Sequence, residues 1–271
     1  MMKSKHILSA AFLTVGIVVS SLAQSDNNIE EIKKTVDKIF VNQPLWSINS
    51  NIYEVNLRQY AKNSTFKSFE KEIPRLKSMG VDILWFMPIH PIGVKQRKGT
   101  LGSYYAVKDY KAVSEEFGTM DDFKHMVNYA HSLGMHVIID WVANHTSPDH
   151  KWTESNPDFY IKDSLGKFVP PVPDWSDVID LNYDNKGMKA AMIDAMKFWL
   201  TDAKIDGFRC DVAEMVPLDF WIEARKELVV ANPNLFMLAE GEKPELHAAF
   251  NMTYTWKGFG VFRKVAKGEY P

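Results

Sequence analysis

The stretch DGFRCDV (residues 206–212) is a short apolar strand pattern that ends on a carboxylate, Asp211. One amphipathic helix pattern later, the stretch LFMLAE (235–240) also ends on a carboxylate, Glu240. Burying a carboxylate at the end of an apolar strand costs free energy, so a partner or a function must account for the presence of both residues. Apolar strands that alternate with helices predict a parallel sheet with right-handed crossovers. The two carboxylates are therefore expected to face one cleft.

The same alternation continues through most of the chain. Strand patterns cover residues 51–57, 81–88, 136–140, 206–212 and 235–240, and helix patterns cover 66–79, 120–133, 188–200 and 217–230. A doubly wound open sheet and an eight-stranded barrel both fit this order. No glycine-rich phosphate loop follows any strand, which counts against a nucleotide-binding open sheet.

Chemically conspicuous residues gather at the carboxyl ends of the strands, where barrel enzymes place their active sites. We therefore predict an α/β fold. It is a (β/α)8 TIM-type barrel with a small inserted loop domain after the third strand, truncated after about five or six strands. The last segment, 250–260, is where a sixth strand would begin.

The composition is that of a globular protein, with 46% hydrophobic and 24% charged residues. A net charge of −2 gives no argument for binding nucleic acid or an anionic membrane. The single cysteine, Cys210, excludes an internal disulfide framework, and its place in a strand predicts a small core residue.

The N-terminus has the pattern of a secretory signal peptide. Two lysines precede an apolar run over 7–19, and the small residues Ser21 and Ala23 follow it. A membrane anchor is the alternative, but the run is short for a membrane span. We expect cleavage after Ala23 and an exported protein, periplasmic or secreted.

The remaining organisation follows from the pattern changes along the chain. Residues 24–45 read as an N-terminal leader helix, 46–144 as the first part of the catalytic barrel and 184–271 as its second part. Between the two barrel parts, 145–183 is rich in Pro, Asp and Trp and has no clear periodicity. A loop of that length is usually functional, so we expect an inserted loop domain there.

Four stretches in order carry a family resemblance: IYEVN (52–56), VIIDWVANH (137–145), FRCDV (208–212) and LAE (238–240). From about Trp46 to its end, the chain resembles the α-amylase superfamily of glycoside hydrolases. The resemblance implies a retaining enzyme that acts on α-1,4-glucans, with an α-glucan or malto-oligosaccharide as substrate. It gives no reason to expect nucleic acid, a membrane after signal cleavage or an organic cofactor, and we expect a monomer.

Asp211 and Glu240 suit the two roles in such a reaction. Side chains alternate along a strand, so Arg209 and Asp211 project on the same side. A guanidinium beside a carboxylate lowers its pKa and keeps it ionised, as a nucleophile requires. Glu240 has apolar neighbours and no cation on its own strand, which suits an acid catalyst. The resemblance implies the same assignment, nucleophile Asp211 and acid/base Glu240, with Arg209 as orienting partner.

The resemblance also implies substrate-binding residues. The counterpart of Asp140 pairs with the arginine matched by Arg209, and His145 resembles the histidine that contacts the sugar being cleaved. Tyr105 resembles the tyrosine that stacks on that sugar, although Ala106 stands where many relatives have an acidic residue. Trp152 and Trp175, in the long loop, are either sugar platforms or that loop's own core.

A calcium site is the one cofactor that the resemblance suggests. Asn144 resembles the family's calcium ligand, and Asp180 is a plausible second ligand, because Ca²⁺ prefers oxygen atoms from loops. Some family members lack the ion, so both states stay open.

Two departures from the family concern the leaving sugar and a third carboxylate. Glu214 and Met215 stand where several α-amylases have Lys-His contacting the leaving sugar. The family's third carboxylate follows a His on the seventh strand, and Pro271 comes too soon to reach it. The sequence is then either a fragment or a truncated product, and we expect this chain to be unstable or nearly inactive. An α-glucosidase or glucan transferase on the same scaffold, or a catalytically incomplete glycan-binding protein, remain as alternatives.

Overall fold

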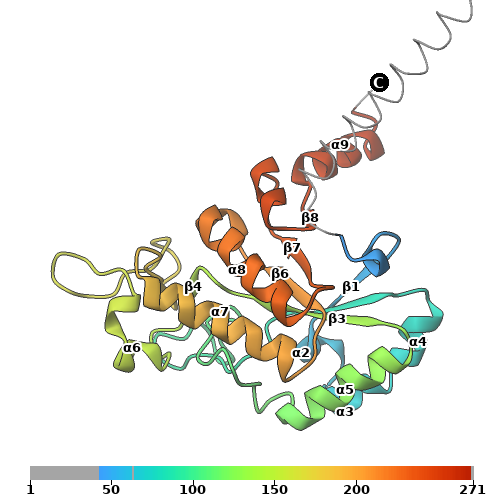
Figure 1. Cartoon of the computed structure of the whole chain (residues 1–271), viewed down its shortest axis with the longest axis horizontal. Helices are drawn as coiled ribbons and strands as arrows, with labels where there is room; N and C mark the ends of the chain where they lie inside the picture. The colour runs from blue at the N-terminus through green and yellow to red at the C-terminus, as the bar shows by residue number, and fades with distance from the viewer. Residues whose placement is uncertain (1–42, 63, 270–271) are drawn as a thin grey trace, which may run out of the picture. The chain divides into compact units, whose positions relative to one another are not determined.

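The computed structural model describes residues 43–62 and 64–269 (Figure 1). Its main feature is a six-stranded parallel sheet in the order β1-β2-β3-β6-β7-β8. The strands are β1 (Ile52–Val55), β2 (Ile83–Phe86), β3 (His136–Trp141), β6 (Gly207–Cys210), β7 (Phe236–Ala239) and β8 (Met252–Thr253). This curled sheet with its helices confirms the predicted truncated (β/α)8 architecture. The sixth strand, β8, has two residues, too few to show a periodic pattern.

Of the four helices that the sequence predicts after residue 45, those over 120–133, 188–200 and 217–230 are present as single helices. The helices are α2 (Leu57–Tyr60), α3 (Phe66–Glu70), α4 (Ile73–Ser78), α5 (Met120–Ser132), α6 (Trp152–Ser155), α7 (Lys186–Thr201), α8 (Leu218–Ala231) and α9 (Trp256–Ala266), with short 3-10 turns η1 (Leu45–Ser47), η2 (Pro157–Phe159), η3 (Ala213–Met215) and η4 (Pro244–Ala248). The single helix predicted over 66–79 is wrong. It is divided into α3 and α4, and Pro74 lies in the first turn of α4, where its missing N–H costs no helical bond.

Side-chain caps fix where several helices start. Thr65 before α3 and Thr119 before α5 each form a capping box with the residue three positions on. Asn185 accepts from the N–H of Met188 at the start of α7. These caps satisfy backbone N–H groups in the first turn of each helix, which have no partner within the helix.

The two faces of the sheet bury different sets of side chains. The outer face packs against the helices, among which α7 and α8 lie side by side (Figure 1). Cys210 is fully buried in this layer, which confirms it as a core residue. A smaller apolar cluster occupies the inner face: Ile83, Trp85, Ile138, Phe236 and Leu238.

Gly207 shows how closely β6 and β7 approach. A Cβ at this position would lie 1.8 Å from the carbonyl oxygen of Phe236, so no other residue fits without moving the backbone. The close approach matters because Asp211 and Glu240, the two carboxylates of the cleft, follow directly after β6 and β7.

The long segment after β3 begins and ends in a second, two-stranded sheet. Its strands β4 (His145–Thr146) and β5 (Ile179–Asp180) pair antiparallel, with His145 opposite Asp180. The pairing brings the two ends of the 145–183 segment together next to the carboxyl end of β3.

The predictions for the N-terminal region fall mostly outside the described residues. These are the signal peptide (1–23) and nearly all of the leader helix (24–45). Within the described part, no helix has the length and apolar character needed to cross a membrane.

Candidate active site

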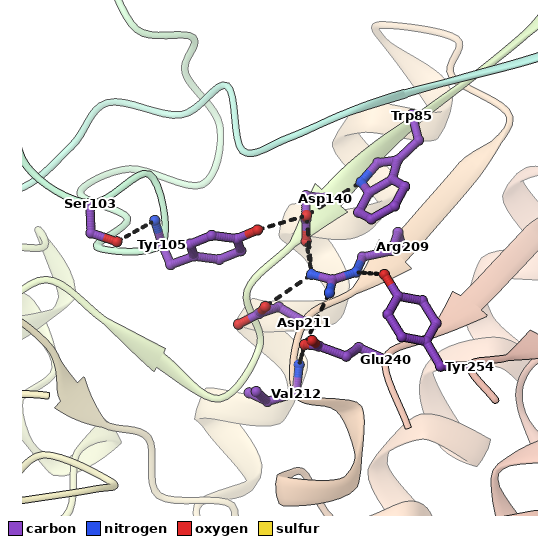
Figure 2. Close-up of polar contacts among 9 residues, drawn as sticks. All are labelled: Trp85, Ser103, Tyr105, Asp140, Arg209, Asp211, Val212, Glu240 and Tyr254. Atoms are coloured by element: carbon purple, nitrogen blue, oxygen red, sulfur yellow. Dashed lines mark hydrogen bonds and ion pairs between the residues drawn. The ribbon is translucent and has the colours of Figure 1, made fainter. Parts of the chain in front are cut away.

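Arg209 is the centre of the candidate site. It lies on β6, paired with Asp140 on β3, and its Nη1 donates to both Asp140 carboxylate oxygens at 2.9 and 3.1 Å. The same nitrogen donates to Oδ1 of Asp211 at 2.9 Å, and Nη2 lies 3.0 Å from Oε2 of Glu240. Figure 2 shows all three carboxylates converging on one guanidinium. The parallel sheet thus brings together residues that lie up to a hundred positions apart in the chain.

A strained turn holds Asp211 and Glu240 next to each other. Val212, directly after Asp211, has φ 38° and ψ 44°, a left-handed conformation that is rare for a β-branched residue. Its N–H donates to Oε2 of Glu240 at 2.8 Å (Figure 2). Backbone strain of this kind costs about 1–3 kcal/mol and is found mainly at functional sites. Here it aims a backbone donor at the second carboxylate.

Two aromatic residues that the sequence did not single out complete the setting of Arg209. The Arg209 guanidinium lies 5.0 Å from the ring centroid of Trp85 and 5.5 Å from that of Tyr254. Nε of Arg209 donates to the Tyr254 hydroxyl at 3.1 Å, and Trp85 Nε1 donates to Asp140 at 3.3 Å. Trp85 could have been predicted from the sequence, because the alternation along β2 places it on the inner face of the sheet. Tyr254 could not, because β8 is too short to show a strand pattern in the sequence.

The electrostatic balance of the cluster differs from the sequence-based expectation. Burial raises the pKa of Asp211 to about 8, and the charges of Asp140 and Glu240 add to the effect, while Arg209 opposes it. Burial likewise raises the pKa of Asp140 to about 7 against the influence of Arg209. Arg209 does lower the pKa of Asp211, as expected, but burial and the neighbouring carboxylates outweigh it, so the expected net lowering of that pKa is wrong. One guanidinium shared by three carboxylates does not offset the burial of Asp140 and Asp211, so burial favours the protonated forms of these two side chains.

The cluster opens into a cleft of about 600 Å³. Its lining includes Tyr105, whose hydroxyl lies 3.5 Å from Asp140 and whose N–H donates to Ser103 (Figure 2). It also includes His145, whose pKa is lowered by burial to about 4, so that the imidazole is neutral. Asp140 lies beneath the cleft, with no exposed surface. The cleft thus offers an aromatic face, a neutral histidine and carboxylates.

The structure separates the two tryptophans of the long loop. Trp175 lines the cleft, and its ring centroid lies 5.5 Å from that of His145. Trp152 instead packs against Tyr110 and Phe159, at ring-centroid distances of 5.2 and 5.6 Å. Trp152 is therefore part of the loop's own core, and Trp175 is available to a ligand.

Glu214, one of the two departures from the family pattern, has a structural use. Its Oε1 accepts from the N–H groups of Glu242 and Lys243 at 2.6 and 3.0 Å. Although partial burial opposes ionisation, these two donors lower the pKa of Glu214. The carboxylate thus fastens the turn after Glu240 to the turn after Asp211.

The two candidate calcium ligands lie close together but form only part of a calcium site. The N–H of Leu181 donates to the carbonyl of Asn144 at 3.3 Å, which places Asp180 beside Asn144. Asn144 also contacts His145 through its amide nitrogen, at 3.2 Å. Ca²⁺ takes six to eight oxygen ligands, yet residues 43–62 and 64–269 contain no group of three or more His, Cys, Asp or Glu that could hold a metal. The remaining ligands would have to be backbone carbonyls and water.

The comparisons with known proteins agree on one family. The family described as "Alpha amylase, catalytic domain" matches residues 59–167 and 173–253, more than half of the chain. A crystal structure of an α-amylase from Lactobacillus plantarum is 42% identical with a TM-score of 0.77, over 81% of this chain and 56% of that one. The noncanonic maltogenic α-amylase AmyB from Thermotoga neapolitana is also 42% identical with a TM-score of 0.77, over 83% and 53%.

Among curated proteins, the α-amylase MalA of Haloarcula japonica is 27% identical over 238 residues, which are 83% of this chain and 35% of that protein. The chain thus spans about half the length of the two solved structures and about a third of this curated relative.

Proposed function

The chain belongs to the α-amylase catalytic-domain family, and we propose on that premise that its cleft cleaves α-1,4-glucosidic bonds with retention of configuration. One observation carries the proposal. Asp211 and Glu240 both contact the guanidinium of Arg209, at 2.9 and 3.0 Å, at the floor of a cleft that also presents Tyr105 and His145. A retaining glycosidase needs two carboxyls about 5–5.5 Å apart, and a shared guanidinium favours such a close pair.

In the proposed reaction Asp211 attacks the anomeric carbon, and Glu240 gives its proton to the departing glycosidic oxygen. The bond from the anomeric carbon to that oxygen breaks as the ester to Asp211 forms. Water then attacks the ester, Glu240 takes a proton from the water, and Asp211 leaves as a carboxylate. Burial favours a proton on Asp140 or Asp211, and the proposed acid catalysis requires a proton to be on Glu240 when the glycosidic oxygen departs.

The surrounding residues have supporting roles in this proposal. Arg209 keeps the ionised form of Asp211 favourable once the proton has moved to Glu240, and Asp140 fixes the guanidinium from below. Tyr105 offers its ring to the apolar face of the sugar, and the neutral His145 contacts its hydroxyl groups.

The anomeric configuration of the first product tests the reaction type. We expect this chain to hydrolyse maltoheptaose slowly, with the α-anomer appearing first by ¹H NMR, and the Asp211→Asn and Glu240→Gln variants to lose the activity that the wild type shows. Initial formation of the β-anomer would rule out the double displacement. An α-glucosidase would prefer maltose to long glucans, a transferase would lengthen its acceptor, and binding without turnover would indicate a glycan-binding protein.

Calcium binding and export complete the proposal. The oxygens of Asn144 and Asp180 are the proposed protein ligands for Ca²⁺, and no step of the reaction depends on the ion. The signal-peptide pattern at 1–23 supports a periplasmic or secreted enzyme.

A further inference from the structure

Two histidines share one carboxylate at the amino end of the sheet, opposite the end that carries the cleft. Asp206 directly precedes β6, His136 is the first residue of β3, and His131 lies in the last turn of α5. Nε2 of His131 lies 2.8 Å from Oδ2 of Asp206, and Nδ1 of His136 lies 3.1 Å from Oδ1. The N–H of Val137 also donates to Oδ2, at 2.7 Å. Asp206 therefore joins α5, β3 and β6.

A tryptophan lies on this cluster. The ring of Trp46 stacks on that of His136, with a centroid distance of 3.8 Å and an interplanar angle of 14°. Trp46 belongs to η1 and also lies 5.6 Å from the ring of Phe236, the first residue of β7. It packs against the apolar cluster on the inner face of the sheet. The segment 43–48, called the Trp46 turn below, is thus held against the amino ends of β3 and β7.

Both kinds of side chain in the cluster have shifted pKa values. The hydrogen bond with Asp206 raises the pKa of His131 above its ordinary value of 6.5, although burial opposes this. Burial opposes the ionisation of Asp206, but hydrogen bonds from His131 and His136 outweigh it and lower the pKa of this carboxyl below 3.8. The imidazolium of His131 and the carboxylate of Asp206 therefore stabilise each other.

Other charged groups adjoin these elements. Lys77 of α4 donates to the carbonyl of Gly134 at 3.3 Å, and the carbonyl of Asp82 accepts from the N–H of His136 at 2.8 Å. The side chains of Lys77 and Asp82 pair with each other at 3.6 Å, and Lys204, before β6, is exposed. Among these groups, an imidazole is the one that changes its charge near neutral pH.

The cluster is strongest in mildly acidic solution. Because the folded state raises the pKa of His131, its contribution to stability is complete below pH 6.5 and is lost as the pH rises through the raised pKa. Because the folded state lowers the pKa of Asp206, its contribution is present above pH 3.8 and is lost as the pH falls through the lowered pKa. Both contributions are present between these two values.

We propose that His131, His136 and Asp206 form a pH-dependent latch, which holds the Trp46 turn in mildly acidic solution and loosens it as the pH rises. A charged imidazole attracts the Asp206 carboxylate, and the face of an indole ring attracts a charged imidazole. Trp46 packs against the inner apolar cluster, so loosening the turn opens that cluster to water. The latch lies away from the cleft and does not depend on the proposed α-glucan function.

Thermal unfolding of the full chain at pH 5.5 and 8.5 tests the latch. His131→Gln keeps a donor in place of Nε2 but cannot become charged, and Asp206→Asn keeps an acceptor for the N–H of Val137. His125→Gln is the matched control, because His125 lies on the same helix, 2.7 Å from Glu70, with a side chain that is 74% exposed. Each variant is compared with the wild type at the same pH, so the carboxylates of the cleft contribute equally to both.

We expect His131→Gln and Asp206→Asn to lower Tm by roughly 2–4 °C more at pH 5.5 than at pH 8.5. His125→Gln should stay within about 1 °C of the wild type at both pH values. An equal loss of Tm at the two pH values, or the same pH-dependent loss in His125→Gln, would overturn the latch. His131→Gln keeps the test decisive should Asp206→Asn not fold.

Amide hydrogen exchange of the peptide 43–50, read by mass spectrometry, follows the Trp46 turn itself. After correction for intrinsic exchange rates, its protection in the wild type should fall at least about threefold from pH 5.5 to pH 8.5. In Asp206→Asn the protection should be the same at both pH values. Wild-type protection that does not depend on pH, or an NMR titration of His131 at or below pH 6.5, would contradict the proposal.

Discussion

Asp211→Asn is predicted to stabilise the protein, and to do so increasingly as the pH rises. The substitution replaces a buried carboxyl with a neutral group of almost the same shape. The folded state raises the pKa of Asp211 from its ordinary value of 3.8 to about 8, chiefly through burial. A carboxyl with a raised pKa in the folded state opposes folding above its unfolded pKa, because ionising it is harder in the cleft than in the unfolded chain.

The magnitude follows from the size of the pKa shift. At ~1.4 kcal/mol per pKa unit the full shift would correspond to ~6 kcal/mol, which is a ceiling. Asp140 competes for the same proton and water enters the cleft, so we expect a gain of ~1–3 kcal/mol at pH 8. For a chain of this size that is roughly 2–8 °C in Tm. Near pH 4, close to the unfolded pKa, the gain should almost vanish.

Thermal unfolding followed by circular dichroism at pH 4, 6 and 8 measures this dependence. Glu223→Gln, at an exposed position of α8, is the control and should melt with the wild type throughout. The same stability difference between Asp211→Asn and the wild type at pH 4 and at pH 8 would refute the charge balance assigned to the cluster. So would a variant that is less stable than the wild type at pH 8.

Three further predictions concern the scaffold around the site. Gly207→Ala should lower the free energy of unfolding by ~3 kcal/mol or more, because its Cβ would meet a backbone carbonyl of β7. Gly260→Ala, which has open space around it on α9, should raise the free energy of unfolding by ~0.5–1 kcal/mol. Melting temperatures of the two variants that agree within a degree would contradict this prediction. Glu214→Ala should speed amide hydrogen exchange at Glu242 and Lys243, and Glu214→Gln, which keeps an acceptor oxygen, should speed it less. Unchanged exchange in both variants would show that the Glu214 side chain does not hold this turn. Chelation of Ca²⁺ with EGTA should lower the Tm of the wild type by ~2 °C or more, and the Tm of Asp180→Asn should not respond to EGTA. A wild-type Tm that EGTA leaves unaltered would argue against the calcium proposal.

The sequence was sufficient for the features that depend on local periodicity. The five longer strands appear where the alternation of apolar segments predicts them, because a buried parallel strand leaves a continuous apolar run. The β8 strand could not be predicted in this way, because a strand of two residues is too short to show a periodic pattern. The helix expected over 66–79 is instead two helices, the second of which has Pro74 in its first turn.

The charge state of the site depended on contacts that no local pattern reveals. Along the strand, Arg209 is the only charge near Asp211, which suggests a lowered pKa. In the fold, β3 and β7 add Asp140 and Glu240 to the same guanidinium, and the sign reverses. Likewise, the bonds of Glu214 cross to the turn after β7, so the sequence showed only a missing family pattern there.

The central claim, that Asp211 is the nucleophile of a retaining glycosidase, is tested most directly by trapping its ester. A 5-fluoro-α-glycosyl fluoride slows the release of a glycosyl-enzyme, and peptide mapping by mass spectrometry then locates the attached sugar. The proposed mechanism predicts the sugar on the peptide that contains Asp211, and its absence from Asp211→Asn. A label on Glu240 or on another carboxylate, or no label on Asp211, would contradict it.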